Sequence, residues 1–292
     1  MGDRDKLEPI IRTEQLSHTY SIGTPFERTA IEGLDFSAFP GEVIGIIGHT
    51  GSGKSTLIQH LNGLLAPTAG QVFFEGEDIH ASKAKTLAVR FQVGIVFQYP
   101  EYQLFEETVY KDIAFGPKNM GLSEPEIQLR VGEAAALVGL HEAELAKSPF
   151  ELSGGQKRRA AIAGVMAMKP RVLILDEPTA GLDPRGREEI SGNIRQFHRE
   201  TGATVILVTH SMEEIARTVE RIVVMQEGRI AMTGSPQEIF TSQGAHLEEM
   251  GLDVPEMTRL ILHMRALGLD LPKDIFTVEQ ASWALLALKG GR

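Results

Sequence analysis

Nine consecutive residues combine glycines with a lysine and hydroxyl side chains, a combination suited to holding phosphate. They are Gly48, His49, Thr50, Gly51, Ser52, Gly53, Lys54, Ser55 and Thr56. Glycines let the backbone curl around an anion so that successive N–H groups point inward. In such a loop Lys54 reaches the β- and γ-phosphates of a nucleotide, and the Ser55 hydroxyl ligates Mg²⁺. The pattern therefore predicts a phosphate-binding loop.

The segments on either side of this loop have the character that it requires. Residues 43–47 form a short apolar run typical of a buried strand, and residues 56–61 resemble the first turns of a helix. A helix that begins at the loop directs the positive end of its dipole toward bound phosphate. The order strand, loop, helix favours a nucleotide site over an ordinary glycine-rich loop.

Three further buried-strand candidates, 93–97, 171–175 and 203–208, also end at polar residues. They lead, in chain order, to Gln98, to Asp176 and Glu177, and to Thr209 and His210. Ligands of open α/β sheets bind at the carboxyl ends of the strands. We therefore expect these side chains to contribute to one site.

Asp176 and Glu177 suggest a division of labour between two adjacent carboxylates. Asp176 follows four aliphatic residues, which predicts a carboxylate on the Mg²⁺ side of the site, acting through water. Glu177 points elsewhere and can accept the proton of an attacking water, a role that contributes roughly 10² to 10⁴ in rate. Water as the acceptor predicts a hydrolase rather than a kinase.

A second anion-binding end lies at residues 152–156, Leu-Ser-Gly-Gly-Gln. Ser153 is a good N-cap for the long helix predicted here, and Gly154 and Gly155, followed by Gln156, expose backbone N–H groups at its positive end. A plain helix start is the alternative, but glycine weakens a helix. Because the first loop is already complete, we expect two chains to face each other, with the Ser153 helix end of each chain contacting the nucleotide of the other.

Strands alternating with helices predict an α/β fold with a mostly parallel sheet. Strands are expected at 10–12, 16–20 and 31–39, and hairpins at 70–79 and 221–232. Residues 106 to 168 are rich in helix patterns, and amphipathic helices are expected at 255–267 and 277–288. We expect a core domain at 1–235, with a helical subdomain at about 100–168, and a helical appendage at 236–292.

Composition narrows the class of protein. The chain has 292 residues, 42% of them hydrophobic, and a net charge of −10, which argues against a nucleic-acid partner. It contains no cysteine, which excludes disulfides and thiolate chemistry. No apolar run approaches the roughly 18 residues that cross a bilayer, and residues 1–6 lack the apolar core of a signal peptide. We expect any work at a membrane to depend on a partner that holds the chain there.

Aromatic residues suggest two further contacts. Tyr20 precedes a turn-rich stretch, where it is either edge-strand filler or a flat face on which adenine stacks. Residues 99–105 carry three aromatics beside Glu101, Glu106 and Glu107. This stretch is either a docking patch for a partner or the packing of a local helical subdomain.

Taken in order, these motifs resemble those of ATP-binding-cassette (ABC) ATPases over essentially the whole core domain. The phosphate loop is the Walker A motif, and residues 152–156, 175–179 and 181–183 match further family motifs. The resemblance implies an ABC-type P-loop NTPase. In that fold a mostly parallel sheet is joined by an antiparallel N-terminal β subdomain, a helical subdomain and, here, a small C-terminal helical domain.

Residues 97–109, with 48–50 and 114–117, resemble more particularly the ATPase subunits of energy-coupling-factor importers of vitamins and metals. Among these subunits the chain is most similar to the second of the two paired ATPases. The resemblance implies ATP and Mg²⁺ as cofactors, and hydrolysis that powers import. It also implies a peripheral location on the cytoplasmic side of the cell membrane.

The resemblance assigns roles to individual residues. Tyr20 would stack on adenine, and Gln98 would sense Mg²⁺ and the γ-phosphate. His210 would hold the γ-phosphate. Ser153 and the two glycines after it would meet the nucleotide of the opposite subunit, and Asp183 would contact the opposite Walker loop.

The implied partners are a second ATPase subunit, a transmembrane coupling subunit docking near residues 98–107, and a separate membrane-embedded substrate-binding subunit. The C-terminal helices would aid dimerisation. The alternatives are a soluble ABC-type ATPase of DNA repair or translation, and a non-catalytic nucleotide-binding regulator. About a hundred residues without heptads separate the Walker loop from Ser153, which argues against the coiled-coil chromosome type. Glu177 and His210 argue against a non-catalytic regulator.

Overall fold

The computed structural model describes residues 7–290, so the prediction about residues 1–6 lies outside the described part. The chain forms two compact units. Unit 1 comprises Met1–Glu42 and Ser55–Ile206, and unit 2 comprises Val43–Lys54 and Leu207–Arg292.

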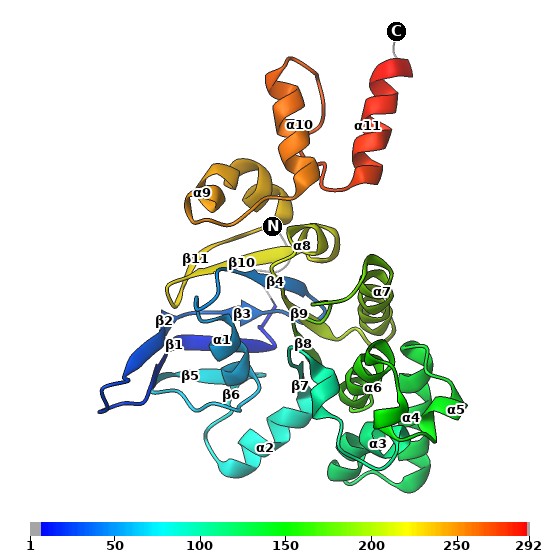
Figure 1. Cartoon of the computed structure of the whole chain (residues 1–292). Coiled ribbons are helices and arrows are strands. Elements are labelled where there is room, and N and C mark those ends of the chain that lie inside the picture. Colours follow the sequence, from blue (N-terminus) through cyan, green and yellow to red (C-terminus); the bar gives the residue numbers. More distant parts are fainter. Residues whose placement is uncertain (1–6, 291–292) are drawn as a thin grey trace. The chain divides into compact units, whose positions relative to one another are not determined.

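Unit 1 contains the expected antiparallel sheet, in which a long first strand pairs with its neighbours on both sides (Figure 1). The strands are β1 (Ile11–Tyr20), β2 (Arg28–Leu34), β3 (Ser37–Ala38), β5 (Ala69–Phe74) and β6 (Glu77–Asp78). The break predicted inside β1 is a fault in register. Gln15 has a φ of 46°, the pairing with β5 shifts between Glu14 and Ser17, and the pairing with β2 shifts between Leu16 and Thr19. The Asp35 carboxylate holds this bulge, because it accepts hydrogen bonds from both the backbone and the side chain of Gln15.

A parallel strand pair in unit 1 supports two of the predicted site segments. β7 (Val93–Val96) follows helix α2 (Lys83–Gln92), which the sequence analysis did not predict, and pairs with β8 (Val172–Asp176). Every residue of β8 is buried. This explains its unbroken aliphatic run, because a parallel strand is covered on both faces.

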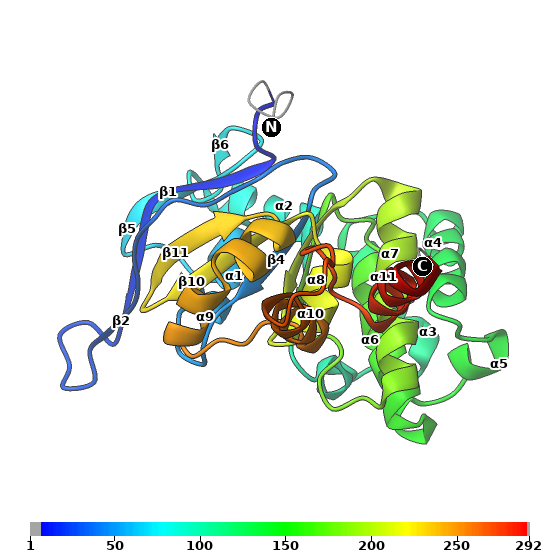
Figure 2. The same cartoon turned by 90° about the horizontal axis from the view of Figure 1, so that it is seen from above.

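The helix-rich part of unit 1 gathers around one long helix, α6 (Gly154–Met166), as both views show (Figures 1 and 2). Its other members are α3 (Val109–Asn119), α4 (Glu124–Leu137), α5 (Glu142–Leu145) and α7 (Pro184–Thr201), with short 3₁₀ turns η2 (Pro100–Gln103) and η3 (Pro149–Glu151). Ile113, Val131 and Ala160 are fully buried. Helices α3 to α6 confirm the helical character predicted for residues 106 to 168.

Unit 2 contains the strand that leads into the phosphate loop. β4 (Val43–Ile47) is completely buried and pairs in parallel with β10 (Arg221–Gln226), which turns back into β11 (Arg229–Gly234). The turn residues Glu227 and Gly228 have φ angles of 48° and 77°, as a tight hairpin requires. After β9 (Thr204–Val208), which begins in unit 1, helix α8 (Met212–Thr218) follows in unit 2.

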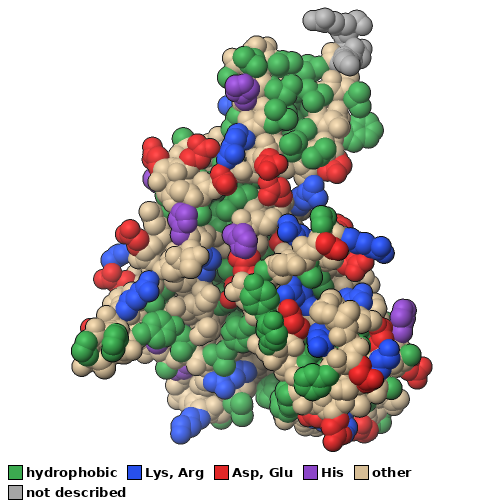
Figure 3. All heavy atoms as spheres, in the orientation of Figure 1, with side chains coloured by type: hydrophobic (Ala, Val, Ile, Leu, Met, Phe, Trp, Pro, Cys, Tyr) green, Lys and Arg blue, Asp and Glu red, His purple; other side chains and the backbone are tan. Residues whose placement is uncertain are grey.

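The C-terminal helices of unit 2 have a small apolar core of their own, formed by Ile261, Leu271, Ile275 and Ala281. They are α9 (Gly244–Glu249), α10 (Glu256–Ala266) and α11 (Val278–Gly290), preceded by a π-helical turn (Glu238–Ser242). Helix α11 differs from the amphipathic expectation. Trp283 is 76% exposed, and apolar side chains gather on the surface of α10 and α11 (Figure 3).

Candidate functional site

The phosphate loop in unit 2 has the backbone geometry that its glycines predict. Gly48, Gly51 and Gly53 all have positive φ angles. A Cβ atom on Gly48 would lie 2.3 Å from the carbonyl oxygen of Met225 and 2.7 Å from the Ser52 hydroxyl, so only glycine fits there. The buried Ser52 hydroxyl has no hydrogen-bond partner among the described residues. A phosphate oxygen in the loop would fit this donor.

Lys54 closes the loop from the inside. Its ammonium group donates hydrogen bonds to the carbonyl oxygens of Gly48, at 2.5 Å, and of His49, at 2.8 Å. The backbone N–H of Ser52 also donates to the His49 carbonyl, at 3.1 Å. The loop therefore places a cation beside the N–H groups that would face a phosphate.

The first residues of helix α1 (Lys54–Leu61) reach the carboxylate predicted for Mg²⁺. Within unit 1, the Ser55 hydroxyl donates a 3.2 Å hydrogen bond to Oδ2 of Asp176, the last residue of β8. Hydroxyl and carboxylate oxygens suit Mg²⁺, which takes few protein ligands and completes its shell with water and substrate phosphates. Residues 7–290 contain no cluster of three His, Asp or Glu side chains able to hold a metal by themselves. This donor pair fits Mg²⁺ brought by a nucleotide.

Glu177 adopts a backbone conformation that residues other than glycine rarely take. Its φ is 51°, in the left-handed region. Non-glycine residues are held there only when the surrounding structure fixes them, and such residues cluster at functional sites. The turn after it is tied by a 3.1 Å bond from the Ala180 N–H to the Glu177 carbonyl, and the neighbours Pro178 and Thr179 are buried. Glu177 is thus held in a turn directly after Asp176.

Gln98 lies at the same sheet edge as these carboxylates. In the parallel β7–β8 pair Val96 is opposite Leu175, so Gln98 follows β7 as Glu177 follows β8. Gln98 is exposed. The strand register therefore brings the ends of β7 and β8 together as the sequence predicted.

The Tyr20 side chain is held in place by contacts with Thr56 and His18. Its hydroxyl lies 3.2 Å from Oγ1 of Thr56 in the first turn of α1, and its ring packs edge-on against His18, with 4.4 Å between ring centroids. His18 in turn packs on the buried His60 of α1, whose ring lies at 4.7 Å. With 39% of its surface exposed, the Tyr20 ring keeps a free face beside the start of α1.

His210, in unit 2, is exposed on a short turn directly after β9. The Thr209 hydroxyl accepts a 3.1 Å hydrogen bond from the Ser211 N–H, and Ser211 caps α8 by accepting from the Glu214 N–H. These bonds fix the turn that carries the imidazole.

The Ser153 end of α6 has the predicted cap. Ser153 and Gln156 form a reciprocal capping box, with bonds of 3.3 and 2.8 Å. A Cβ on Gly154 or on Gly155 would meet no atom within 4 Å. Packing within the chain therefore does not require these glycines, and they leave space for something outside the chain.

The Asp183 turn lies beside this helix end. Asp183 caps α7 by accepting a 2.7 Å hydrogen bond from the Gly186 N–H. A hollow of about 100 Å³ is lined by Ser153 and Gly155 together with Leu182 and Gly186. Unit 1 thus brings together the two segments that the sequence analysis assigned to a neighbouring subunit, the Ser153 segment to its nucleotide and the Asp183 segment to its Walker loop.

The aromatic stretch after Gln98 is exposed, but two of the carboxylates beside it form ion pairs. Tyr102 and Phe105 are 85% and 62% exposed. Glu101, expected among the exposed carboxylates, instead pairs with Arg158 of α6, with its oxygens 2.9 and 3.0 Å from the guanidinium. Glu107 pairs with Lys111 one turn away.

Arg158 itself was missed by the sequence analysis. It is 3% exposed, and besides Glu101 it donates to the carbonyl oxygens of Ala180, at 2.5 Å, and Pro178, at 3.4 Å. One side chain therefore joins the aromatic stretch to the turn that follows Glu177. No local sequence pattern indicates this role of Arg158, because its partners lie 20 to 57 positions away in sequence.

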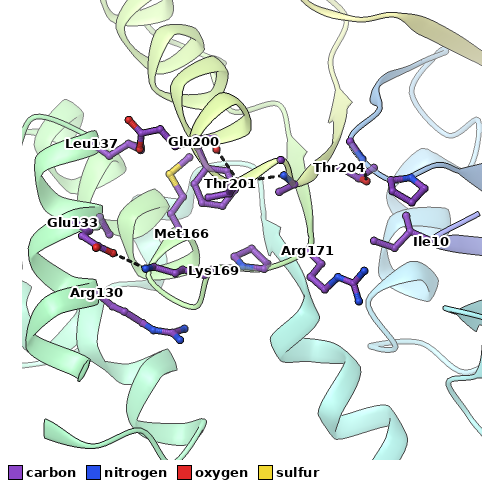
Figure 4. Close-up of a pocket in the computed structure, with 17 residues that line it drawn as sticks. Ile10, Arg130, Glu133, Leu137, Met166, Lys169, Arg171, Glu200, Thr201 and Thr204 are labelled. Atoms are coloured by element: carbon purple, nitrogen blue, oxygen red, sulfur yellow. Dashed lines mark hydrogen bonds and ion pairs between the residues drawn. The ribbon is translucent and has the colours of Figure 1, made fainter. Parts of the chain in front are cut away.

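A cavity of about 710 Å³ lies elsewhere in unit 1 (Figure 4). It is lined by Arg171, just before β8, and Thr204, the first residue of β9, whereas Asp176 ends β8. Lys169 and Glu133 form a 2.7 Å ion pair in its wall. The cavity is therefore at the amino ends of the strands, and none of the predicted site residues lines it.

Comparison with known proteins gives a consistent result. Residues 31–180 match the family model described as "ABC transporter". Proteins named "Energy-coupling factor transporter ATP-binding protein EcfA2" from Clostridium perfringens and Caldanaerobacter subterraneus are 53% and 52% identical to this chain. They cover 95% and 94% of it, and the matches span 98% and 96% of their own lengths.

Solved structures agree. The structure of cbiO1 from Clostridium perfringens, described as part of the ABC transporter complex cbiONQ, has a TM-score of 0.73 at 40% identity. It covers 87% of this chain and 99% of its own. The ATP-binding cassette MJ0796, solved as a dimer bound to ADP and Pi, has a TM-score of 0.70 at 27% identity. It covers 77% of this chain and 98% of its own. The expected fold class is confirmed.

Proposed function

This chain belongs to the ABC transporter family, and we propose that it is the ATP-binding and ATP-hydrolysing subunit that powers an energy-coupling-factor importer. The observation that carries the proposal is the 3.2 Å contact between Ser55 and Asp176, with the phosphate loop ending at Ser55 and Glu177 following Asp176. The 53% identity to a protein named as an ATP-binding subunit of such an importer, over 95% of this chain, supports it.

In this proposal the loop N–H groups and Lys54 bind the β- and γ-phosphates, and Ser55, Asp176 and Gln98 hold Mg²⁺. The bound Mg²⁺ would offset charge on the phosphates. Glu177 orients a water and takes its proton as the water oxygen bonds to the γ-phosphorus, and the bond to the β-phosphate oxygen breaks to leave ADP. His210 holds the γ-phosphate, and Tyr20 stacks on adenine.

A second ATPase subunit completes the site in this proposal. Ser153, Gly154, Gly155 and Gln156 would meet the neighbour's nucleotide, and Asp183 its Walker loop. Two features support this: the open space at both glycines and the hollow that joins the two segments. Closure on ATP and opening after hydrolysis would then move whatever is docked on the pair.

The membrane partners belong to the same proposal. A transmembrane coupling subunit would dock near residues 98–107, where Tyr102 and Phe105 are exposed. A separate membrane-embedded subunit would bind the vitamin or transition-metal ion. Residues 7–290 contain no helix with the length and apolar character needed to cross a bilayer. We propose that these partners hold the chain at the cytoplasmic side of the cell membrane.

We also propose a division at residue 235, with an ATP-binding domain at 1–235, its helical subdomain at about 100–168, and a dimerisation domain at 236–292. The separate apolar core of the C-terminal helices and the exposed Trp283 support a contact role for them.

The test is purification of the tagged chain from solubilised membranes, with identification of every co-purifying protein and assay of MgATP hydrolysis. We expect an ATPase partner and integral membrane proteins. Recovery of ribosomes or DNA-repair proteins without membrane proteins would contradict the proposal and favour a soluble ABC ATPase.

A further inference from the structure

The C-terminal helices contact the phosphate loop directly within unit 2. Nε2 of His49, the second residue of the loop, lies 2.6 Å from the carbonyl oxygen of Met250, although 201 positions separate the two residues. A carbonyl can only accept, so Nε2 carries the proton and donates. We propose that the turn at Met250 and Gly251 positions the phosphate loop through His49, so that this turn and nucleotide binding are coupled.

The acceptor belongs to a well-formed helix end. Met250 caps the C-terminus of α9, where the last carbonyls lack partners within the helix. The Gly251 N–H donates to Glu248 and the Leu252 N–H to Leu247, both at 2.8 Å, which is a Schellman motif. Leu247 is fully buried. The turn is therefore a rigid support, and His49 satisfies a carbonyl at its end.

Gly251 leaves the space that the His49 ring occupies. Its φ is 71°, and a Cβ on it would lie 2.8 Å from Nε2 and 3.3 Å from Cε1 of His49. The imidazole is the far end of a flexible side chain, so it would swing away and lose the bond to Met250. Gly268, also left-handed at 92° and at the end of α10, has no atom within 4 Å of such a Cβ. Of these two glycines, Gly251 is the one whose Cβ would meet the loop.

The hydrogen bonds of the His49 backbone explain how the contact with Met250 would affect phosphate binding. The His49 carbonyl accepts hydrogen bonds from Lys54 Nζ and from the Ser52 N–H. A movement of His49 therefore displaces its carbonyl oxygen. That oxygen positions both the Lys54 ammonium and the Ser52 N–H, which belong to the phosphate-binding loop. Coupling free energies are reciprocal, so a triphosphate in the loop must also act on the turn at Gly251. This inference rests on the proposed ATP-binding function.

A double-mutant cycle tests it in the full-length chain. Gly251→Ala and Gly268→Ala are each made with His49 intact and in a His49→Ala background, and the affinity for a non-hydrolysable ATP analogue with Mg²⁺ is measured. With His49 intact, Gly251→Ala should weaken binding about fivefold or more relative to Gly268→Ala, the lower end of typical coupling. In the His49→Ala background the two variants should bind alike.

Equal affinities of the two glycine variants with His49 intact would overturn the inference. It would also be overturned if Gly251→Ala still bound the analogue more weakly than Gly268→Ala in the His49→Ala background. Either result leaves the proposed function standing, because the chain still binds ATP. Failure of the unmodified chain to bind the analogue would overturn both.

Hydrogen exchange on the unmodified chain gives a second measurement that does not depend on the folding of Gly251→Ala. Adding the analogue with Mg²⁺ should slow exchange of the Gly251 and Leu252 amides and leave those at 268–269 unchanged. Unchanged exchange at Gly251 and Leu252 in the bound chain would overturn the inference.

Discussion

Arg158 holds Glu101 by two hydrogen bonds, of 3.0 Å from Nε and 2.9 Å from Nη2, while the same guanidinium binds the Ala180 carbonyl. The side chains are 4% and 17% exposed, so the ion pair is largely buried. It links the exposed aromatic stretch to the turn that carries Glu177. In the proposed docking at residues 98–107, a movement of the partner would reach the turn that carries Glu177 through this contact.

Arg158→Met should destabilise the fold by about 3–5 kcal/mol, because it leaves the Glu101 carboxylate buried without its partner. Adding Glu101→Gln should recover part of that loss, since the uncompensated charge is removed. Denaturant unfolding measures both variants. Arg195→Met, which breaks the exposed pair with Glu188, is the control, and its effect should stay within about 1 kcal/mol. A similar small effect at Arg158 would contradict the assigned role.

Replacing Glu106 and Glu107 by Ala should leave nucleotide binding intact while weakening recovery of the membrane partner. Glu107 is exposed and Glu106 is half-buried, and these two carboxylates, rather than Glu101, form the acidic side of the stretch near 98–107. Affinity purification from membranes measures the recovery. The control, Glu142→Ala with Glu200→Ala, removes the same charge from other exposed positions. Equal recovery of the partner by both double variants would count against docking at this stretch.

Glu177→Gln should bind MgATP and hydrolyse it about 10² to 10⁴ times more slowly, because only the proton acceptor is lost. Phosphate release and binding of a fluorescent ATP analogue measure the two effects. Glu75→Gln is a matched control, since Glu75 also has a left-handed backbone, with a φ of 50°, but lies in the β5–β6 turn. Undiminished hydrolysis by Glu177→Gln would exclude the role of this residue as the base.

Stability should depend on the protonation of His60. Burial, the largest cause, lowers the pKa of His60 in the folded chain, and the nearby His18 lowers it further. Below the ordinary histidine pKa of about 6.5 the unfolded chain binds the extra proton more readily, so the free energy of unfolding falls as pH drops. His60→Gln should flatten this slope between about pH 7 and pH 5.5. His263→Gln, at an exposed position, should not, and equal slopes in both variants would contradict the prediction.

The sequence predicted the parts of the site that depend on neighbours along the chain. The apolar run 43–47 became β4, the four aliphatic residues before Asp176 became a fully buried strand, and Ser153 capped its helix. Each of these follows from a local pattern: a strand buried on both faces, or a cap that meets the N–H groups of the next turn.

Contacts between distant segments could not be predicted in this way. His49 meets Met250, and Arg158 meets Glu101, because the fold brings distant segments together whose sequences show no pattern that indicates the pairing. The exposure of α11 shows a related limit. Its pattern predicted an amphipathic helix, but Trp283 stays on the surface, because burial depends on which neighbours are present.

In the proposed ATPase pair, Ser153 of one subunit closes on the nucleotide of its neighbour, and the reactivity of a thiol at this position reports on that closure. Because the chain contains no cysteine, Ser153→Cys introduces a single thiol. In the Glu177→Gln background, purified with its partner ATPase, MgATP should strongly slow the reaction of this thiol with a maleimide, whereas a thiol at the exposed Glu142 should react as before. An unchanged rate at position 153 in the ATP-bound pair would contradict the account.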